Sequence, residues 1–123
     1  MSLVPMDDRD GWIWLDGQFT PWREAKVHVL THGLHYASAV FEGERMYGGE
    51  IFKLTEHTER LFKSAEILDF SIPYTVAQID EACKQTCALN NLADCYVRPI
   101  AWRGSEVMGV SAQQSKIHAA IAA

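Results

Sequence analysis

The stretch VFEGERMYGGEIFKL, residues 40–54, decides the fold expected for this chain. Two runs of β-favouring residues flank Gly48-Gly49, a dipeptide that reaches the positive φ angles of a tight hairpin turn. Gly43 interrupts the first run, and a glycine inside a strand marks either a bulge or a close approach of another group to the backbone. We therefore expect a β-hairpin over 40–54 with an irregularity at Gly43.

Two helices are expected directly after this hairpin. Thr55 can cap a helix that runs to about residue 69, because apolar side chains recur there at helical spacing. The pair Thr75 and Gln78 has the capping-box pattern and predicts the start of a second helix. Asn90-Asn91 would end it, since asparagine tolerates the left-handed conformation.

Further strands are expected on both sides of these helices. Residues 95–102 alternate as a strand, and 117–121 begin another. Upstream, residues 12–20 predict a hairpin around Asp16-Gly17. Residues 27–39 lack a clean period and predict an irregular segment with a short helical turn.

These elements predict an α+β fold: an antiparallel-rich sheet of four or five strands with two helices packed on one face. The length of 123 residues fits one domain or a piece of a longer protein. We expect residues 1–11 to be disordered or tag-derived and residues 12–123 to form the domain.

Charge and cysteine content restrict the partners and the compartment. The formal net charge of −5 argues against binding to nucleic acid or to an anionic membrane, both of which need clustered positive charge. Three cysteines without a CxxC pair favour reduced thiols in a cytoplasmic protein. We therefore predict a cytoplasmic protein.

The histidines and cysteines give weak signals for chemistry. His28, His32 and His35 could hold a metal only on a helix that Gly33 weakens, so hydrogen-bonded structural histidines are the better interpretation and no metal is predicted. The cysteines are expected to act as small apolar residues.

Two arginines are more informative. Arg60, near the start of the first expected helix, could hold a phosphate, or it could pair with Glu56 one turn earlier. Arg98 is expected on an inner strand face with Tyr96 and Trp102, where its charge requires an anion. A carboxylate substrate is one candidate for that anion, and Glu42 or Glu44 is the other.

Several spaced motifs resemble the N-terminal domain of branched-chain amino-acid aminotransferases, which are class-IV, fold-type-IV pyridoxal-phosphate enzymes. The resemblance extends from Trp12 to Ala123. The motifs that carry it, in chain order, are KVHVLTHGLHY (26–36), VFEGER (40–45), HTERL (57–61), YVRP (96–99) and MGV (108–110).

The resemblance implies roles for particular residues. Arg60 matches the residue that binds the phosphate of pyridoxal 5'-phosphate. Arg98 matches the residue that pairs with the distal carboxylate of glutamate. The residues that match the substrate pocket are Phe41, Gly43, Arg45, Tyr96 and Arg98. Tyr36 and Val110 match residues that reach into the neighbouring subunit's site, which implies a homodimer. The implied substrates are L-leucine, L-isoleucine or L-valine and 2-oxoglutarate.

One departure from the family pattern is large. The family's Schiff-base lysine lies in a C-terminal domain that this sequence does not contain, so no catalytic residue is expected in this chain and the fragment is expected to be inactive alone. A D-amino-acid transaminase or aminodeoxychorismate lyase of the same superfamily, and a non-catalytic binding or assembly domain, remain alternatives. The lysines that fail to match are Lys26, Lys53, Lys63, Lys84 and Lys116.

Overall fold

The computed structural model describes residues 3–123 and contains one seven-stranded sheet with helices. The strand order is β2-β1-β7-β6-β4-β5, with β3 also beside β6, and the neighbouring strands pair antiparallel. The sheet has more strands than the four or five expected, partly because the run 40–47 is divided in two. The elements are β1 (Trp12–Leu15), β2 (Gln18–Pro21), the 3-10 helix η1 (Trp22–Glu24), α1 (His32–Tyr36), β3 (Ala39–Phe41), β4 (Glu44–Tyr47), β5 (Glu50–Ile51), α2 (Leu54–Ile67), α3 (Val76–Leu89), β6 (Cys95–Arg103) and β7 (Ile117–Ala122).

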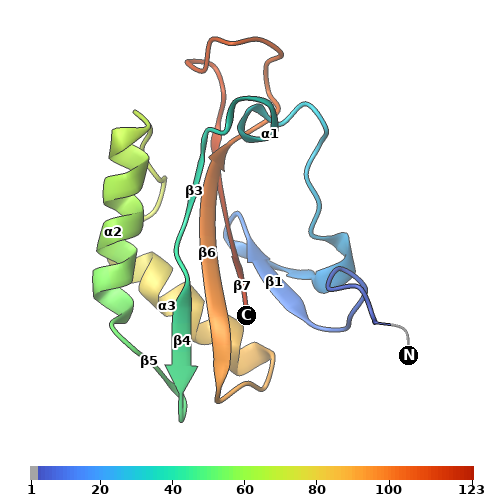
Figure 1. Ribbon diagram of the computed structural model, residues 1–123, viewed down its shortest axis with the longest axis vertical. Helices are drawn as coiled ribbons and strands as arrows, with labels where there is room; N and C mark the ends of the chain where they lie inside the picture. Colours follow the sequence, from blue (N-terminus) through green and yellow to red (C-terminus); the bar gives the residue numbers. More distant parts are fainter. Residues whose placement is uncertain (1–2) are drawn as a thin grey trace.

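Helices α2 and α3 cover one face of the sheet, as Figure 1 shows. The core lies between these layers, where Leu61 of α2 and Ile79 of α3 pack with Val97 of β6 and Ile121 of β7. Each of these side chains is at most 2% exposed, and full burial of a side chain of this size contributes about 1.5–3 kcal/mol. The predicted fold class is confirmed. None of the helices in residues 3–123 is long and apolar enough to cross a membrane.

The irregularity at Gly43 leaves the strand register unchanged. Phe41 pairs with Ile100 before the break and Glu44 pairs with Val97 after it, so no residue is inserted and there is no bulge. Between these pairs the Glu42 N–H donates to the Pro99 carbonyl at 3.0 Å. Proline has no N–H to donate in return, which explains why the ladder is interrupted.

The two long helices begin in different ways. The prediction for α3 is confirmed: the Gln78 N–H donates to Thr75 Oγ1 at 3.1 Å, and the Thr75 N–H donates to Gln78 Oε1 at 2.8 Å. The prediction that Thr55 caps α2 is wrong, because Lys53, at φ 56°, is the residue before the helix. Thr55 lies inside the first turn and its hydroxyl donates to Asp80 Oδ2 on α3 at 2.7 Å.

The N-terminal segment runs along η1. Residues 1 and 2 lie outside the described residues, and residues 3–11, the rest of the segment that we expected to be disordered or tag-derived, form no helix or strand. The Trp22 indole donates to the Met6 carbonyl at 2.6 Å, and Arg23 pairs with Asp8 at 2.8 Å and with Asp10 at 2.6 Å. These contacts hold residues 6–10 against η1.

Candidate functional site

Arg98 lies between two aromatic rings on the sheet face opposite the long helices. Its Cζ is 4.8 Å from the centre of the Phe41 ring and 5.2 Å from the centre of the Tyr96 ring, and its Nε donates to the Tyr96 hydroxyl at 3.0 Å. A guanidinium over an aromatic face is attracted by the negative charge of the ring face. The rings therefore fix the position of the positive charge.

The expectation that Arg98 lies on an inner face is wrong. Arg98 is exposed and Tyr96 is 39% exposed, whereas the alternate β6 residues Val97 and Pro99 face the helices and are buried. The expected pairing of Arg98 with Glu42 or Glu44 is also wrong, because both carboxylates lie on the helix side of the sheet and Arg98 lies on the opposite side. In residues 3–123 no carboxylate lies within ion-pair distance of Arg98.

Gly43 places bare backbone beneath the Tyr96 ring. A Cβ added to Gly43 would lie 2.8 Å from the Tyr96 hydroxyl oxygen and 3.1 Å from Cε2. Real side chains almost never accept so short a distance, so any other residue would displace the tyrosine. Of the two expectations for Gly43, close approach is therefore the correct one.

Arg45 completes this group of predicted substrate residues. It is the direct cross-strand partner of Tyr96, and such partners lie on the same face of a sheet. Its Cζ is 5.8 Å from the centre of the Tyr47 ring. The structure thus brings the five predicted substrate residues to one sheet face: Phe41, Gly43, Arg45, Tyr96 and Arg98.

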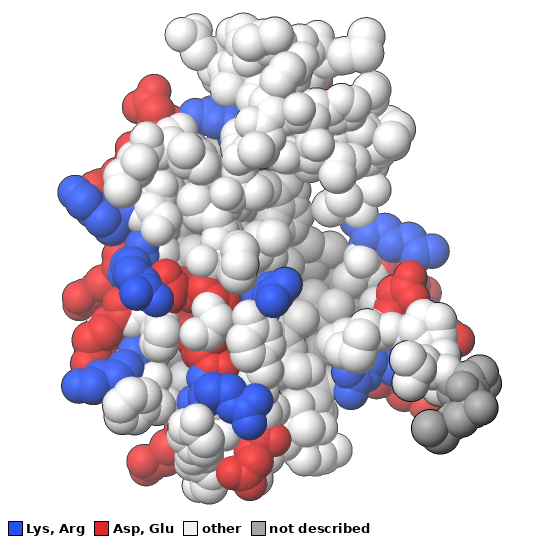
Figure 2. Space-filling view, viewed as in Figure 1, with Lys and Arg blue, Asp and Glu red and all other residues white. Residues whose placement is uncertain are grey.

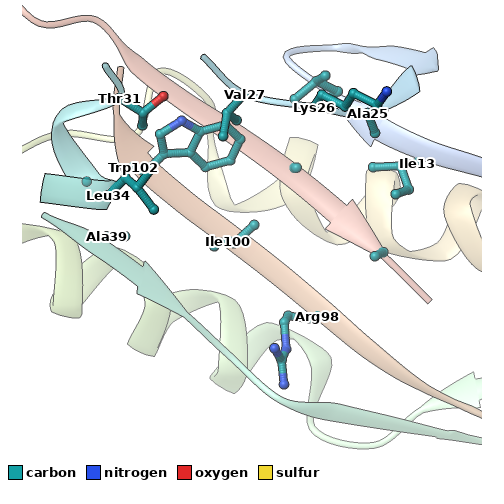
Figure 3. Close-up of a pocket in the computed structure, with 14 residues that line it drawn as sticks. Ile13, Ala25, Lys26, Val27, Thr31, Leu34, Ala39, Arg98, Ile100 and Trp102 are labelled. Atoms are coloured by element: carbon teal, nitrogen blue, oxygen red, sulfur yellow. The ribbon is translucent and has the colours of Figure 1, made fainter. Parts of the chain in front are cut away.

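A hollow of about 400 Å³ continues along this face. Arg98, Ile100 and Trp102 of β6 line this hollow together with residues of the segment from Ala25 to Leu34 (Figure 3). The remaining lining is mainly aliphatic. Such a surface suits an apolar group, with the guanidinium of Arg98 at one end.

Arg60 of α2 contacts Glu42, which lies between β3 and β4, from the helix side of the sheet. Its Nε donates to Glu42 Oε2 and its Nη2 to Glu42 Oε1, both at 2.8 Å, and His57 Nδ1 lies 2.7 Å from Oε1. The hydrogen bonds from Arg60, followed by those from His57, lower the pKa of the buried Glu42 carboxyl despite its burial. The pairing with Glu56 was wrong.

The position of Arg60 in its helix also differs from the expectation. The free N–H groups of α2 belong to its first turn, which starts at Leu54, so Arg60 lies more than one turn beyond them. The helix N-terminus therefore does not form an anion site with Arg60. A guanidinium has five N–H donors, and Glu42 occupies two of them. The remaining three are available to an anion, and the side chain is 68% exposed.

Tyr36 and Val110 lie in neighbouring segments that His32 joins. The His32 ring is 4.6 Å from the Tyr36 ring, its Nε2 is 3.0 Å from the Val110 carbonyl oxygen, and its Nδ1 is 2.6 Å from Ser38 Oγ. Residues 3–123 contain no cluster of three or more potential metal ligands. The hydrogen bonds from both ring nitrogens of His32 are those expected of a structural histidine.

The surface around Tyr36 and Val110 is largely uncharged. Figure 2 shows mostly white atoms in the upper part of the molecule, where Figure 1 places α1, whereas charged residues gather over α2 and the lower strands. Val110 is 75% exposed and Tyr36 is 47% exposed. Other large apolar side chains exposed in these two segments are Leu34, Val107 and Met108.

Sequence reasoning missed the role of Glu42 in holding Arg60. A signal was present in the alternation of VFEGER, because Glu42 and Glu44 fall on the opposite strand side from Phe41, Gly43 and Arg45. Two acidic residues on the core side of a strand need partners, and the adjacent helix supplies Arg60 and His57 to Glu42. Within residues 3–123, Glu44 has no such ion-pair partner.

Residues 39–123 match the family model described as amino-transferase class IV. The chain therefore belongs to the class-IV aminotransferase family. Its sequence is 50% identical over 124 residues to the branched-chain-amino-acid aminotransferase of Pseudomonas aeruginosa, covering 98% of this chain and 40% of that relative. The corresponding Escherichia coli K12 protein is 40% identical over 104 residues, covering 81% of this chain and 34% of that relative.

Solved structures agree with these sequence matches. The crystal structure of the Escherichia coli branched-chain amino acid aminotransferase has a TM-score of 0.87 and 36% identity, covering 93% of this chain and 39% of that one. The enzyme from Thermoproteus uzoniensis with norvaline has a TM-score of 0.86 and 34% identity, covering 93% and 40%. The chain thus spans about two fifths of the length of the relatives it matches.

Proposed function

We propose that this chain forms the N-terminal part of a branched-chain amino-acid transaminase, which transfers the amino group of L-leucine, L-isoleucine or L-valine to 2-oxoglutarate. The observation that carries the proposal is the position of Arg98, held between Phe41 and Tyr96 beside an aliphatic hollow. Membership of the class-IV family supports the reaction type. The names of the relatives support the substrate class.

The proposed pocket accepts two unlike side chains by using different groups for each. The rings of Phe41 and Tyr96 provide apolar walls for a branched aliphatic chain. Arg98 and the Tyr96 hydroxyl provide donors for the second carboxylate of glutamate or 2-oxoglutarate. Gly43 keeps the backbone clear beneath Tyr96, and Arg45 adds a positive charge beside it.

Pyridoxal 5'-phosphate is the proposed cofactor; when bound, it would supply the aldehyde that accepts the amino group and the electron-withdrawing ring. A further solved branched-chain amino acid aminotransferase, at 38% identity and a TM-score of 0.84, is complexed with N-(5'-phosphopyridoxyl)-L-glutamate. In this chain Arg60 would hold the phosphate. Its donor set fits, because the bidentate pair with Glu42 leaves three N–H groups and fixes the guanidinium plane.

A homodimer is proposed as the working assembly. Tyr36 and Val110 would contribute to the neighbouring subunit's site, and the uncharged, exposed apolar surface around them supports a contact there. The cytoplasmic location stays a prediction.

The test uses a chimera in which residues 1–123 replace the matching part of the Pseudomonas aeruginosa relative. We expect transamination of L-leucine with 2-oxoglutarate and none of D-alanine. Activity on D-alanine alone would instead indicate a D-amino-acid transaminase. A folded chimera that binds pyridoxal phosphate but transaminates no amino acid would refute the proposal and favour a binding or assembly domain.

Two substitutions in the same chimera test the assigned residues separately. Arg98→Ala should reduce turnover with glutamate far more than the first binding of leucine, because glutamate presents a second carboxylate and leucine does not. Arg60→Ala should weaken pyridoxal phosphate binding by about 2–3 kcal/mol, the contribution of a charged hydrogen-bond partner. Equal losses for both amino acids, or unchanged cofactor affinity, would contradict these roles.

A further inference from the structure

Cys87 and Cys95 place their sulfur atoms next to each other. Cys87 lies in the last turn of α3, Cys95 is the first residue of β6, and the Sγ–Sγ distance is 3.8 Å with both thiols free. A disulfide requires a sulfur–sulfur distance of about 2.05 Å. A movement of about 2 Å, shared between two side chains at the ends of their elements, would therefore join them.

The two thiols differ in their access to solvent. Cys95 is partly exposed and is one of the residues that line a hollow of about 570 Å³, whereas Cys87 is fully buried. Arg9 and Arg98 also line this hollow. Their positive charges favour the approach of an anionic reagent. Burial, followed by the neighbouring Cys95, raises the pKa of the Cys87 thiol, so Cys87 reacts second and slowly.

We propose that Cys95 and Cys87 are a modification site at which a small anionic disulfide, such as oxidised glutathione, forms an intrachain disulfide. The Cys95 thiolate attacks one sulfur of the reagent, whose S–S bond breaks to release one thiol and leave a mixed disulfide on Cys95. Cys87 then loses its proton and attacks Cys95 Sγ, which breaks the mixed disulfide and releases a second thiol. The protein loses two electrons and two protons, and one reagent disulfide becomes two thiols.

The bond would act on the candidate substrate site. It ties the end of α3 to the residue directly before Tyr96, and drawing the sulfurs together moves the start of β6. The Tyr96 ring already lies against Gly43 at close distance. Oxidation therefore alters the position of the ring and of the Arg98 side chain bonded to it.

The test treats the folded 123-residue chain with oxidised glutathione at pH 8, blocks the remaining thiols and digests the protein with trypsin. Cleavage after Lys84 and Arg103, with the Arg98-Pro99 bond resistant, places both cysteines in the peptide 85–103. We expect this peptide to lose two hydrogen atoms without gaining a cross-link to another peptide. Cys83 falls in the separate peptide 64–84 and should be recovered in its blocked, reduced form.

Substitutions identify the order of reaction. Cys87→Ser should stop at a mixed disulfide on Cys95, Cys95→Ser should prevent the modification, and Cys83→Ser should behave as the unmodified sequence does. Circular dichroism checks that each variant is folded, and the peptide map of the unsubstituted chain stands even if a variant is not. A stable mixed disulfide in the unsubstituted chain, a bond to Cys83, or no reaction would each overturn the proposal.

Discussion

Replacement of Glu44 by glutamine tests the energetic cost of a carboxyl group in the core. Glu44 begins β4 and is 1% exposed, and neither carboxyl oxygen has a hydrogen-bond partner among the described residues. Burial, followed by the negative charges of Glu42 and Asp80, raises its pKa from 4.5 to about 7. The folded protein therefore favours the neutral form of Glu44 much more than the unfolded chain does.

The size and sign of the effect follow from this difference in pKa. Below pH 4.5 the group is protonated in both states and its titration costs nothing. As the pH rises from 4.5 towards 7 the unfolded chain loses the proton first, so folding becomes less favourable. Above about pH 7 the full penalty applies, and the pKa change corresponds to about 3 kcal/mol.

Urea unfolding of the two proteins at pH 4 and at pH 8 measures this penalty. Glu44→Gln should gain about 3 kcal/mol relative to the unsubstituted chain between the two pH values. The cost of burying the amide is present at both pH values and cancels in this comparison. Glu59→Gln, which removes an exposed carboxyl from α2, should show little change. If the stability difference caused by Glu44→Gln is the same at both pH values, the argument fails.

Three further substitutions test single contacts. Gly43→Ala should destabilise the chain by about 1 kcal/mol and alter the near-ultraviolet circular dichroism of Tyr96, because the new Cβ displaces the partly exposed Tyr96 ring. Asn90→Ala should lower the free energy of unfolding by about 1–3 kcal/mol, because its amide accepts from the Trp12 N–H at 2.9 Å and donates to the Trp12 carbonyl at 3.0 Å. An unchanged urea midpoint would contradict either prediction. The carboxylates of Asp16 and Glu106, each 2.7 Å from a ring nitrogen of His118, raise the pKa of His118 despite its burial. The protonated His118 therefore stabilises the fold fully below pH 6.5, and this contribution disappears as the pH rises through the raised pKa. His118→Gln should make the free energy of unfolding less dependent on pH above 6.5. An unaltered dependence would refute the assignment.

Local sequence signals predicted the elements whose causes are local. The Asp16-Gly17 turn forms, with Asp16 at φ 50° and Gly17 at φ 89°. The Thr75 capping box forms with both hydrogen bonds. In each case a few adjacent residues provide the turn geometry or the hydrogen bonds, so the pattern is sufficient.

The errors arose where distant residues compete for a side chain. Thr55 carries the hydroxyl of a helix cap, but Asp80 of α3 takes its hydrogen bond. Arg60 has Glu56 one turn away, but Glu42 offers both oxygens from the neighbouring strand. The sequence spacing cannot rank these partners, because the distance between them depends on how α2 packs against α3 and β3.

The site was predicted in part for a similar reason. Alternation along β6 placed Tyr96 and Arg98 on one face, which the structure confirms. It could not indicate which face the helices cover, because both faces carry apolar residues. Which face of β6 is covered depends on how α2 and α3 pack against the sheet.

The pairing of residues 41–46 with β6 keeps one register across Gly43, so the number of residues in this segment determines which side chains face the helices. Because side chains alternate, deletion of one residue between Phe41 and Glu44 would shift every later position by one and exchange the two sides. Arg45 would then turn towards the helices, and Glu44 would leave the core for the open face. A change of one residue in the length of this segment would therefore remove Arg45 from the candidate site and place an acidic side chain there instead.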